Sequence, residues 1–285
     1  MGVKYTSKAI LLLLCISLNQ TILADAEKLS LTLSSGLRVN ADYWQGESDQ
    51  PSVMIVHGFL QTSSFSTVRR LAESLADSGY SVLTPTLSLG LDDRQQSLSC
   101  EAMHLHTMQS DTEEIGLWVD KLKELSGKSP VLVAHSAGSI QAIAYLDNAP
   151  KGTVDRSILI SLTAFGEGPG AFETLAIAKD MQAMADAGVE RLVDSALAFC
   201  KTYLTTPKGF LSYYEWSGDR IKASMAENGV DNHVVVGGKD PRIDLEWIYG
   251  LQKSGATVHE VAGANHFFDQ AHEFDLLDEV EALLN

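Results

Sequence analysis

Short, continuous apolar runs recur along most of this chain, and they constrain the fold more than any other feature of the sequence. They lie at residues 53–56, 81–83, 131–134, 158–160 and 234–236, with a weaker run at 256–258. A strand with one face in water alternates apolar and polar residues, whereas a continuous run indicates a strand that is covered on both faces. The sequence therefore predicts a set of buried parallel strands.

Segments with apolar residues at helical spacing separate these runs. The clearest lie at 68–75, 115–125 and 140–144, and a closing helix is expected over 274–284. Alternation of strands and helices predicts an α/β fold with a mostly parallel central sheet and helices on both faces. Residues 28–46 alternate apolar and polar around Ser35 and Gly36, which predicts an antiparallel hairpin ahead of the parallel strands.

Residues 165–230 interrupt this alternation. We expect a helix-rich insertion there, with helices over 172–184, 189–204 and 221–228, and interpret it as a lid over one edge of the sheet. The insertion is rich in aromatic side chains, which would either line an apolar substrate pocket or pack the lid onto the body. They are Tyr203, Phe210, Tyr213, Tyr214 and Trp216. Of these, Trp216 is the candidate substrate contact.

The first 26 residues have the pattern of a leader for export. Lys4 and Lys8 precede the apolar run 9–18, and Ala24 and Ala26 offer small residues for cleavage. An uncleaved anchor is the alternative, but a spanning helix needs roughly 20 apolar residues. We expect residues 1–26 to be a signal peptide and residues 27–285 to form one exported domain, periplasmic or secreted, with no later membrane span.

The formal charge of −16 excludes some partners. Proteins that bind nucleic acid present a basic face to the phosphates, and proteins that dock electrostatically on anionic lipid need a basic surface as well. We therefore expect a small-molecule substrate and no nucleic-acid partner.

Ala134, His135, Ser136, Ala137 and Gly138 directly follow the apolar run 131–134, and helical spacing begins at once after them. Strand, tight turn and helix with small residues around a serine is the context of a nucleophile elbow, Gly-x-Ser-x-Gly. The segment resembles the elbow of the α/β-hydrolase superfamily, and the resemblance extends from about residue 51 to the end. Ala134 stands where the family has its first glycine. The resemblance implies that Ser136 is the nucleophile.

A serine hydroxyl needs a base, and the base needs a carboxylate that orients it. In this superfamily the three follow in the order Ser, Asp or Glu, His. Asp240 follows the run 234–236 and a glycine turn, and His266 precedes the last helix, so the resemblance implies that they are the acid and the base. Taken singly, Asp240 would suit a turn and His266 a core position. Glu167, beyond the run 158–160, is the alternative acid.

The resemblance also implies an oxyanion hole made by the backbone N–H groups of Phe59 and Ala137. Phe59 follows the run 53–56 by way of His57 and Gly58. A backbone donor imposes little on the neighbouring side chains, so we expect His57 and His135 to have structural roles.

His104 and His106 lie close to Cys100 and Asp111, which raises the question of a metal site. Zinc takes three or four ligands of suitable geometry, and no further spaced cluster completes the set, so we predict no metal. The segment should pass near the active site, which makes His104 and His106 candidate substrate contacts. No dinucleotide or phosphate-binding motif is present in the sequence, and no cofactor is expected.

Two cysteines, Cys100 and Cys200, remain after removal of the leader. In an oxidising compartment they are expected to pair, and the alternative is two unrelated buried thiols. A bridge would tie the loop after the run 81–83 to the lid.

Together these features predict a serine hydrolase that cleaves a carboxylic ester or thioester through an acyl-enzyme. Two alternatives stay open. One is a peptidase or lactonase, because the same scaffold hosts several chemistries. The other is a non-catalytic exported protein that binds a ligand or maintains the envelope and merely retains the fold.

Overall fold

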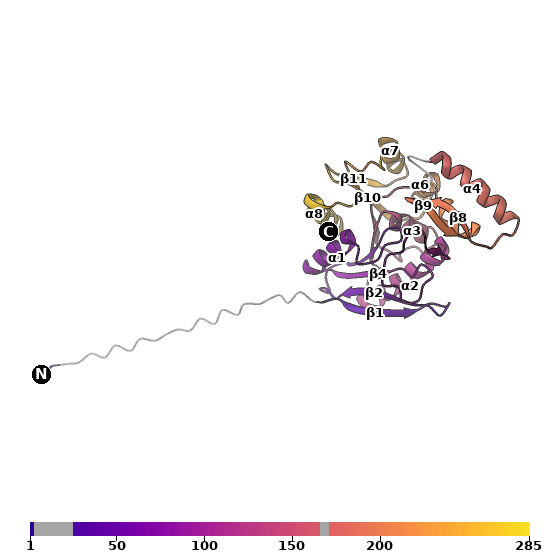
Figure 1. Cartoon of the computed structure of the whole chain (residues 1–285). Coiled ribbons are helices and arrows are strands. Elements are labelled where there is room, and N and C mark those ends of the chain that lie inside the picture. Colours follow the sequence, from indigo (N-terminus) through magenta and orange to yellow (C-terminus); the bar gives the residue numbers. More distant parts are fainter. Residues whose placement is uncertain (3–24, 166–170) are drawn as a thin grey trace.

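The computed structural model describes residues 1–2, 25–165 and 171–285. An eight-stranded sheet runs through the molecule in the order β1-β2-β4-β3-β6-β7-β10-β11 (Figure 1). Its strands are β1 (Glu27–Thr32), β2 (Arg38–Trp44), β3 (Ser52–Val56), β4 (Ser81–Thr86), β6 (Val131–His135), β7 (Arg156–Ile160), β10 (Asp231–Gly237) and β11 (Thr257–Val261). From β4 to β11 every neighbouring pair is parallel. The predicted parallel sheet is thus confirmed, and the runs at 53–56, 81–83, 131–134, 158–160 and 234–236 are buried strands. β11, at the weaker run 256–258, lies at the edge of the sheet, and none of its residues is buried.

The N-terminal hairpin is also confirmed. β1 pairs antiparallel with β2, with Leu29 opposite Ala41 and Leu31 opposite Val39, and β2 continues antiparallel along β4. Gly36 in the connecting turn has a φ of 87°, a conformation that glycine adopts without steric cost.

Helices cover both faces of the sheet, which explains the continuous apolar runs. The helices are α1 (Ser66–Asp77), α2 (Met108–Ser126), α3 (Ala137–Leu146), α7 (Leu245–Lys253) and α8 (Glu273–Leu284). Val53 and Ile55 of β3 pack with α1 and α8, whereas Met54 and Val56 pack with α2 and α3 on the other face. Burying each such side chain stabilises the fold by about 1.5–3 kcal/mol, so the strands are held firmly and their carboxyl ends form a rigid platform.

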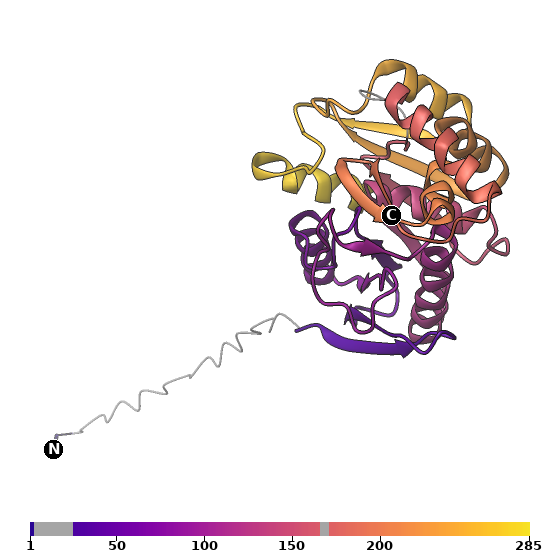
Figure 2. The ribbon, with the colours of Figure 1, turned by 45° about the vertical axis from the view of Figure 1, so that its right-hand side comes forward.

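The segment between β7 and β10 corrects one prediction. It contains α4 (Ala171–Asp186), β8 (Val193–Leu197), β9 (Cys200–Thr205), α5 (Pro207–Tyr214) and α6 (Gly218–Glu227). The helix expected over 189–204 is wrong, because these residues form an antiparallel hairpin, β8-β9, and β5 (Met103–His104) adds to it as a parallel third strand. Figures 1 and 2 show the hairpin beside α4.

Burial with a period of two explains the hairpin. Ser195 and Leu197 are buried on β8, and Tyr203 and Thr205 are buried on β9, while the residues between them are more exposed. Ala198 in the turn has a φ of 52°, which reverses the chain without a glycine. The helices expected over 172–184 and 221–228 correspond to α4 and α6.

Candidate active site

Ser136 occupies a tight turn between β6 and α3, with φ 56° and ψ −125°. Its N–H donates to the carbonyl of Ile160 at the end of β7, 2.8 Å away. A Cβ atom on Gly138 would lie 2.3 Å from the carbonyl oxygen of His57, so only glycine permits this approach of the turn to β3. Ala134, which replaces the family's first glycine, is fully buried in β6. The strained backbone presents the Ser136 side chain beyond the end of the strand.

Ser136, His266 and Asp240 form one hydrogen-bonded chain. His266 Nε2 lies 2.9 Å from Ser136 Oγ, and His266 Nδ1 lies 2.6 Å from Asp240 Oδ2. A carboxylate only accepts, so Nδ1 carries the proton and Nε2 is left free to accept the serine proton. His266 is 3% exposed and Asp240 is 4% exposed, which removes both from bulk water. This tautomer is the one in which an imidazole acts as a general base toward a serine.

Asp240 follows β10 and is fixed by its own turn. Its N–H donates to the carbonyl of Gly237 at 2.9 Å, and its Oδ1 accepts from the backbone N–H of Arg242 at 3.0 Å. Burial raises the pKa of Asp240, but the hydrogen bond and charge of His266, aided by Arg242, outweigh it and hold the pKa below its ordinary value. Asp240 is therefore a carboxylate at neutral pH.

The loop that carries His266 is bound to the body on several sides. The carbonyl oxygen of His266 accepts from His135 Nε2 at 3.0 Å and from Ser161 Oγ at 2.8 Å. Thr67 Oγ1 on α1 donates to the carbonyl of Phe267 at 2.8 Å. Burial lowers the pKa of His135 to about 4, so its imidazole is neutral and its role here is structural. Sequence reasoning missed Ser161 and Thr67 in this role, because neither belongs to a recognisable motif.

The turn after β3 lies against the serine. A Cβ atom on Gly58 would lie 3.4 Å from the Cβ atom of Ser136, and Gln61 N–H closes the turn on the carbonyl of Gly58 at 3.1 Å. Phe59 is the second residue of this turn. Ala137 is the first residue of α3, where backbone N–H groups have no acceptor within the helix. Both predicted oxyanion donors thus belong to segments that flank Ser136.

Aromatic rings surround Phe59. Its ring centroid lies 6.0 Å from Phe165, 5.6 Å from Phe199 and 5.6 Å from Tyr203, so the hairpin β8-β9 packs directly on the turn. Phe199 at the hairpin tip remains 65% exposed. The surroundings of the turn are therefore apolar on the side of the insertion.

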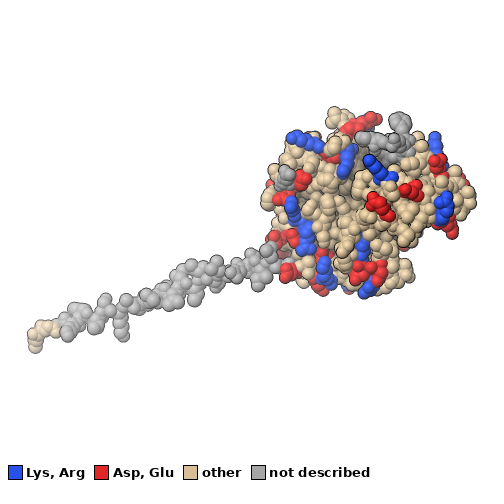
Figure 3. Space-filling model, in the orientation of Figure 1, with Lys and Arg blue, Asp and Glu red and all other residues tan. Residues whose placement is uncertain are grey.

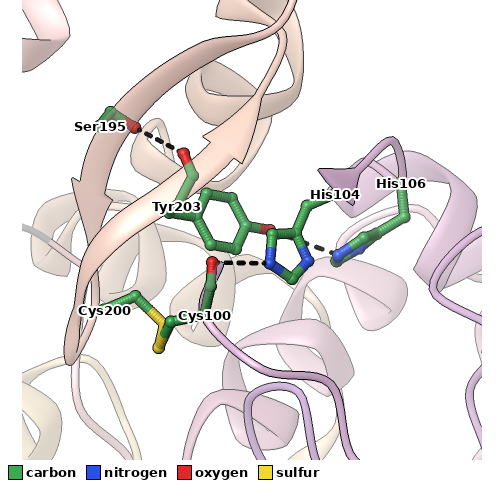
Figure 4. The surroundings of a disulfide bond; sticks show 6 residues. All are labelled: Cys100, His104, His106, Ser195, Cys200 and Tyr203. Atoms are coloured by element: carbon green, nitrogen blue, oxygen red, sulfur yellow. Dashed lines mark hydrogen bonds between the residues drawn. A yellow bond between two sulfur atoms is a disulfide. The ribbon is translucent and has the colours of Figure 1, made fainter. Parts of the chain in front are cut away.

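His104 and His106 lie in the packed interior beneath the hairpin. Figure 4 shows the ring of His104 against Tyr203, with centroids 4.1 Å apart, and His104 Nε2 lies 3.2 Å from the carbonyl oxygen of Cys100. His106 Nδ1 lies 2.6 Å from Tyr213 Oη, which also hydrogen-bonds to Asp111.

Trp216 is also buried, and its ring packs under the guanidinium of Arg220 at 4.0 Å. His104, His106 and Trp216 all have contacts within the protein, and contact of any of them with substrate stays a prediction that their burial does not favour. Glu167, the alternative acid, lies outside the described residues. Asp240 is the carboxylate that pairs with His266.

Cys100 and Cys200 form a disulfide that closes a separation of 100 residues. It joins the loop ahead of β5 to Cys200, the first residue of β9 (Figure 4). Phe199 directly precedes Cys200 in the chain. The predicted bridge between this loop and the insertion is therefore present.

Within residues 25–165 and 171–285, no group of three or more His, Cys, Asp or Glu side chains is arranged to hold a metal ion. No helix in the described part of the chain has the length and apolarity that crossing a bilayer requires.

On the face of the molecule that Figure 3 shows, basic and acidic side chains lie interspersed. The predicted signal peptide falls mainly on residues 3–24, outside the described part.

A mostly parallel sheet with Ser, Asp and His beyond the ends of three of its strands, here β6, β10 and β11, in that order along the chain, defines the class of α/β hydrolases. The model of the alpha/beta hydrolase family matches residues 53–276, more than half of the chain, and this chain belongs to that family. No curated protein is similar enough in sequence to match it.

Three solved structures illustrate the likeness of fold. Est1E from Butyrivibrio proteoclasticus has a TM-score of 0.65 and 15% identity, over 92% of this chain and 99% of its own. A soluble variant of monoglyceride lipase from Saccharomyces cerevisiae has a TM-score of 0.67 and 12% identity, over 92% and 96%. The thioesterase domain from the curacin biosynthetic pathway has a TM-score of 0.60 and 16% identity, over 92% and 99%. At such identities the likeness shows the fold alone.

Proposed function

We propose that this protein is a serine hydrolase that cleaves carboxylic esters or thioesters through an acyl-enzyme. The observation that carries the proposal is the unbroken chain from Ser136 Oγ through His266 to Asp240, with distances of 2.9 and 2.6 Å. Ser136 attacks the carbonyl carbon while His266 Nε2 takes its proton. His266 then returns the proton to the leaving alcohol or thiol, and Asp240 stabilises the imidazolium between the two steps.

In the second half of the reaction, water replaces the serine hydroxyl. His266 takes a proton from the water, which attacks the acyl-enzyme, and the proton passes to Ser136 as the acid product leaves. The N–H groups of Phe59 and Ala137 stabilise the oxyanion in both halves, and loss of one such donor typically costs 100- to 1000-fold in rate. Nothing in this cycle requires a redox step.

The choice of ester or thioester rests on two supports. Phe59, Phe165, Phe199 and Tyr203 make the surroundings of the turn apolar, which suits an acyl or aryl group. A soluble variant of a monoglyceride lipase, a thioesterase domain and Est1E share the fold. The segment 165–230 acts in this proposal as a lid, and the predicted leader together with the disulfide supports export to the periplasm or the medium.

Hydrolysis of matched short-chain p-nitrophenyl esters, acyl thioesters and p-nitroanilides by the purified domain 27–285 tests the proposal. We expect turnover of the esters or thioesters, with an initial burst if deacylation is slow, and loss of turnover in Ser136→Ala. Turnover of the anilides alone would favour the peptidase alternative. A folded protein that hydrolyses none of the three substrate classes would favour the non-catalytic alternative.

A further inference from the structure

Arg94 is a buried cation that the reaction above does not use. It is 4% exposed, and its guanidinium donates in several directions. Nε donates to the carbonyl of Leu87 at 2.6 Å, Nη1 to the carbonyl of Gln96 at 2.8 Å, and Nη2 to the carbonyl of Gln61 at 2.7 Å. Nη2 also lies 3.2 Å from His57 Nε2. One side chain therefore holds the loop after β4 and the turn after β3 together.

Arg94 remains charged in this environment. Burial lowers its pKa to about 10, and the negative charges of the nearby acidic groups Glu114 and Asp111 oppose that effect. A lysine has a single compact ammonium in place of the planar fork and would not reach the same set of acceptors.

The guanidinium contacts both sides of the turn that contains Phe59. His57 directly precedes this turn, and Gln61 ends it with an N–H that donates to the carbonyl of Gly58. Leu60 inside the turn has a φ of 58°, which is unfavourable for a branched residue and has to be maintained by the surroundings.

Arg94 also sets the proton position on His57. An arginine only donates, and the backbone N–H of Leu87 donates to the same His57 Nε2 at 3.1 Å. Nε2 must therefore accept, and the proton lies on Nδ1, which donates to the carbonyl of Gly58 at 2.9 Å. Burial and the charge of Arg94 lower the pKa of His57 to about 3, so the ring stays neutral.

The Gly58 carbonyl and the Phe59 N–H belong to the same peptide unit. In a planar trans peptide these two groups point in opposite directions. Because the carbonyl accepts from both His57 Nδ1 and the N–H of Gln61, the direction of the Phe59 N–H is fixed as well. This peptide lies beside Ser136, since a Cβ atom on Gly58 would be 3.4 Å from the Ser136 Cβ atom.

We propose that Arg94 is a positioning residue for the oxyanion hole, which acts through His57 and Gln61 to hold the peptide that presents the Phe59 N–H. The inference rests on the proposed function and extends it to a residue that does not touch the substrate. An oxyanion donor contributes more in the transition state than in the ground state, so its misplacement lowers kcat and leaves KM nearly unchanged.

Steady-state kinetics of Arg94→Lys and Arg94→Ala on an activated ester test this proposal. We expect kcat to fall about 10- to 100-fold in both variants. This loss does not exceed the loss of about 100- to 1000-fold that follows removal of a whole oxyanion donor, because the Phe59 N–H is misplaced and not removed. Affinity for a trifluoromethyl ketone, which forms an oxyanion with the serine, should fall by the same factor, while affinity for the matching methyl carbinol should not change. Guanidinium added to Arg94→Ala should recover part of kcat.

Arg38→Lys is the matched control, because Arg38 is an exposed arginine that pairs with Asp92 in the same loop region. It should keep wild-type kcat. Thermal unfolding of each variant ensures that the assay temperature lies below the transition. A kcat within twofold of wild type in folded Arg94→Lys and Arg94→Ala, or equal losses for the ketone and the carbinol, would overturn the proposal.

Amide hydrogen exchange separates this inference from the proposed function. The N–H of Gln61 should exchange faster with solvent in Arg94→Ala than in the wild type, whatever the activity of the protein. In Arg38→Lys its exchange rate should be the same as in the wild type. An inactive wild type would contradict the proposed function and the oxyanion role together. Unchanged exchange at Gln61 would contradict the claim that Arg94 holds the turn, even in an active enzyme.

Discussion

His266 Nε2 lies 2.9 Å from Ser136 Oγ, although 130 residues separate them in the chain. The contact arises because β6 and β11 have their carboxyl ends at the same edge of a parallel sheet, so the residues that follow them lie close together. Gly237 lets the loop of His266 approach Asp240. A Cβ atom at Gly237 would lie 2.5 Å from the carbonyl oxygen of Ala264, and a larger residue would push that loop away.

His266→Ala should lower kcat on an activated aryl ester by about 10⁴-fold or more, because it removes the base that activates Ser136. The matched control is His272→Ala, which removes a partly exposed imidazole that pairs with Asp275. Only the His266 variant should lose activity. Wild-type kcat in His266→Ala would disprove the assignment of the base.

Asp240→Asn should lower kcat about 10⁴-fold, since an amide at this position can donate to Nδ1 and favour the wrong tautomer of His266. Glu167→Gln should leave kcat close to that of the wild type. Steady-state kinetics of the two variants at neutral pH decide between the two carboxylates. Severe impairment of Glu167→Gln, with an active Asp240→Asn, would move the acid to the segment after β7.

The stability of the fold should depend on pH through two buried histidines. The pKa of His57 is lowered to about 3 and that of His135 to about 4, mainly by burial, whereas an unfolded histidine titrates near 6.5. Between these values the unfolded chain binds more protons than the folded one. Both contributions are therefore present above pH 6.5 and are lost as the pH falls, that of His135 down to about pH 4 and that of His57 down to about pH 3.

From pH 7 to pH 5, each of these two histidines should lower the free energy of unfolding by about 2 kcal/mol. Urea unfolding of the wild type and of His135→Gln at both pH values measures the effect. The glutamine variant should show a smaller difference between the two pH values. An equal difference in both proteins would show that His135 does not carry this linkage.

Reduction of the bridge between Cys100 and Cys200 should destabilise the protein by up to about 4.7 kcal/mol, the value for a loop of about 100 residues in the chain-entropy model. The bridge ends beside Phe199, which packs on Phe59, so its loss should loosen the hairpin and change KM more than kcat. Urea unfolding and kinetics of the double variant Cys100→Ser, Cys200→Ser test both effects. A change in kcat alone would contradict this account of the bridge.

The sheet could be predicted from the sequence because each buried strand is a local, continuous apolar run. The hairpin β8-β9 could not, because part of its stabilisation comes from pairing with β5, about 100 residues earlier, and from a turn in which Ala198 takes a φ of 52°. The spacing of apolar residues over 189–204 suits a helix as well as it suits a pair of strands.

The candidate triad was predictable because a serine in an elbow and two loops after strands are local patterns in a fixed order. The contacts of Arg94 were not, because its principal acceptors are backbone carbonyl oxygens of Gln61, Leu87 and Gln96. Every residue except proline has the same backbone groups, so a sequence carries no sign of which carbonyl a buried arginine will meet.

Labelling of the purified domain 27–285 with a fluorophosphonate probe, followed by tandem mass spectrometry of the labelled peptide, tests directly whether Ser136 is the nucleophile. The matched control is Ser139→Ala. Ser139 lies three residues further along, in α3, and is fully buried, and its Oγ donates to the carbonyls of Ala134 and Ile160. We expect one label per molecule, on Ser136, which persists in Ser139→Ala and disappears in Ser136→Ala. No label on a folded wild-type protein, or a label that persists in Ser136→Ala, would contradict this expectation.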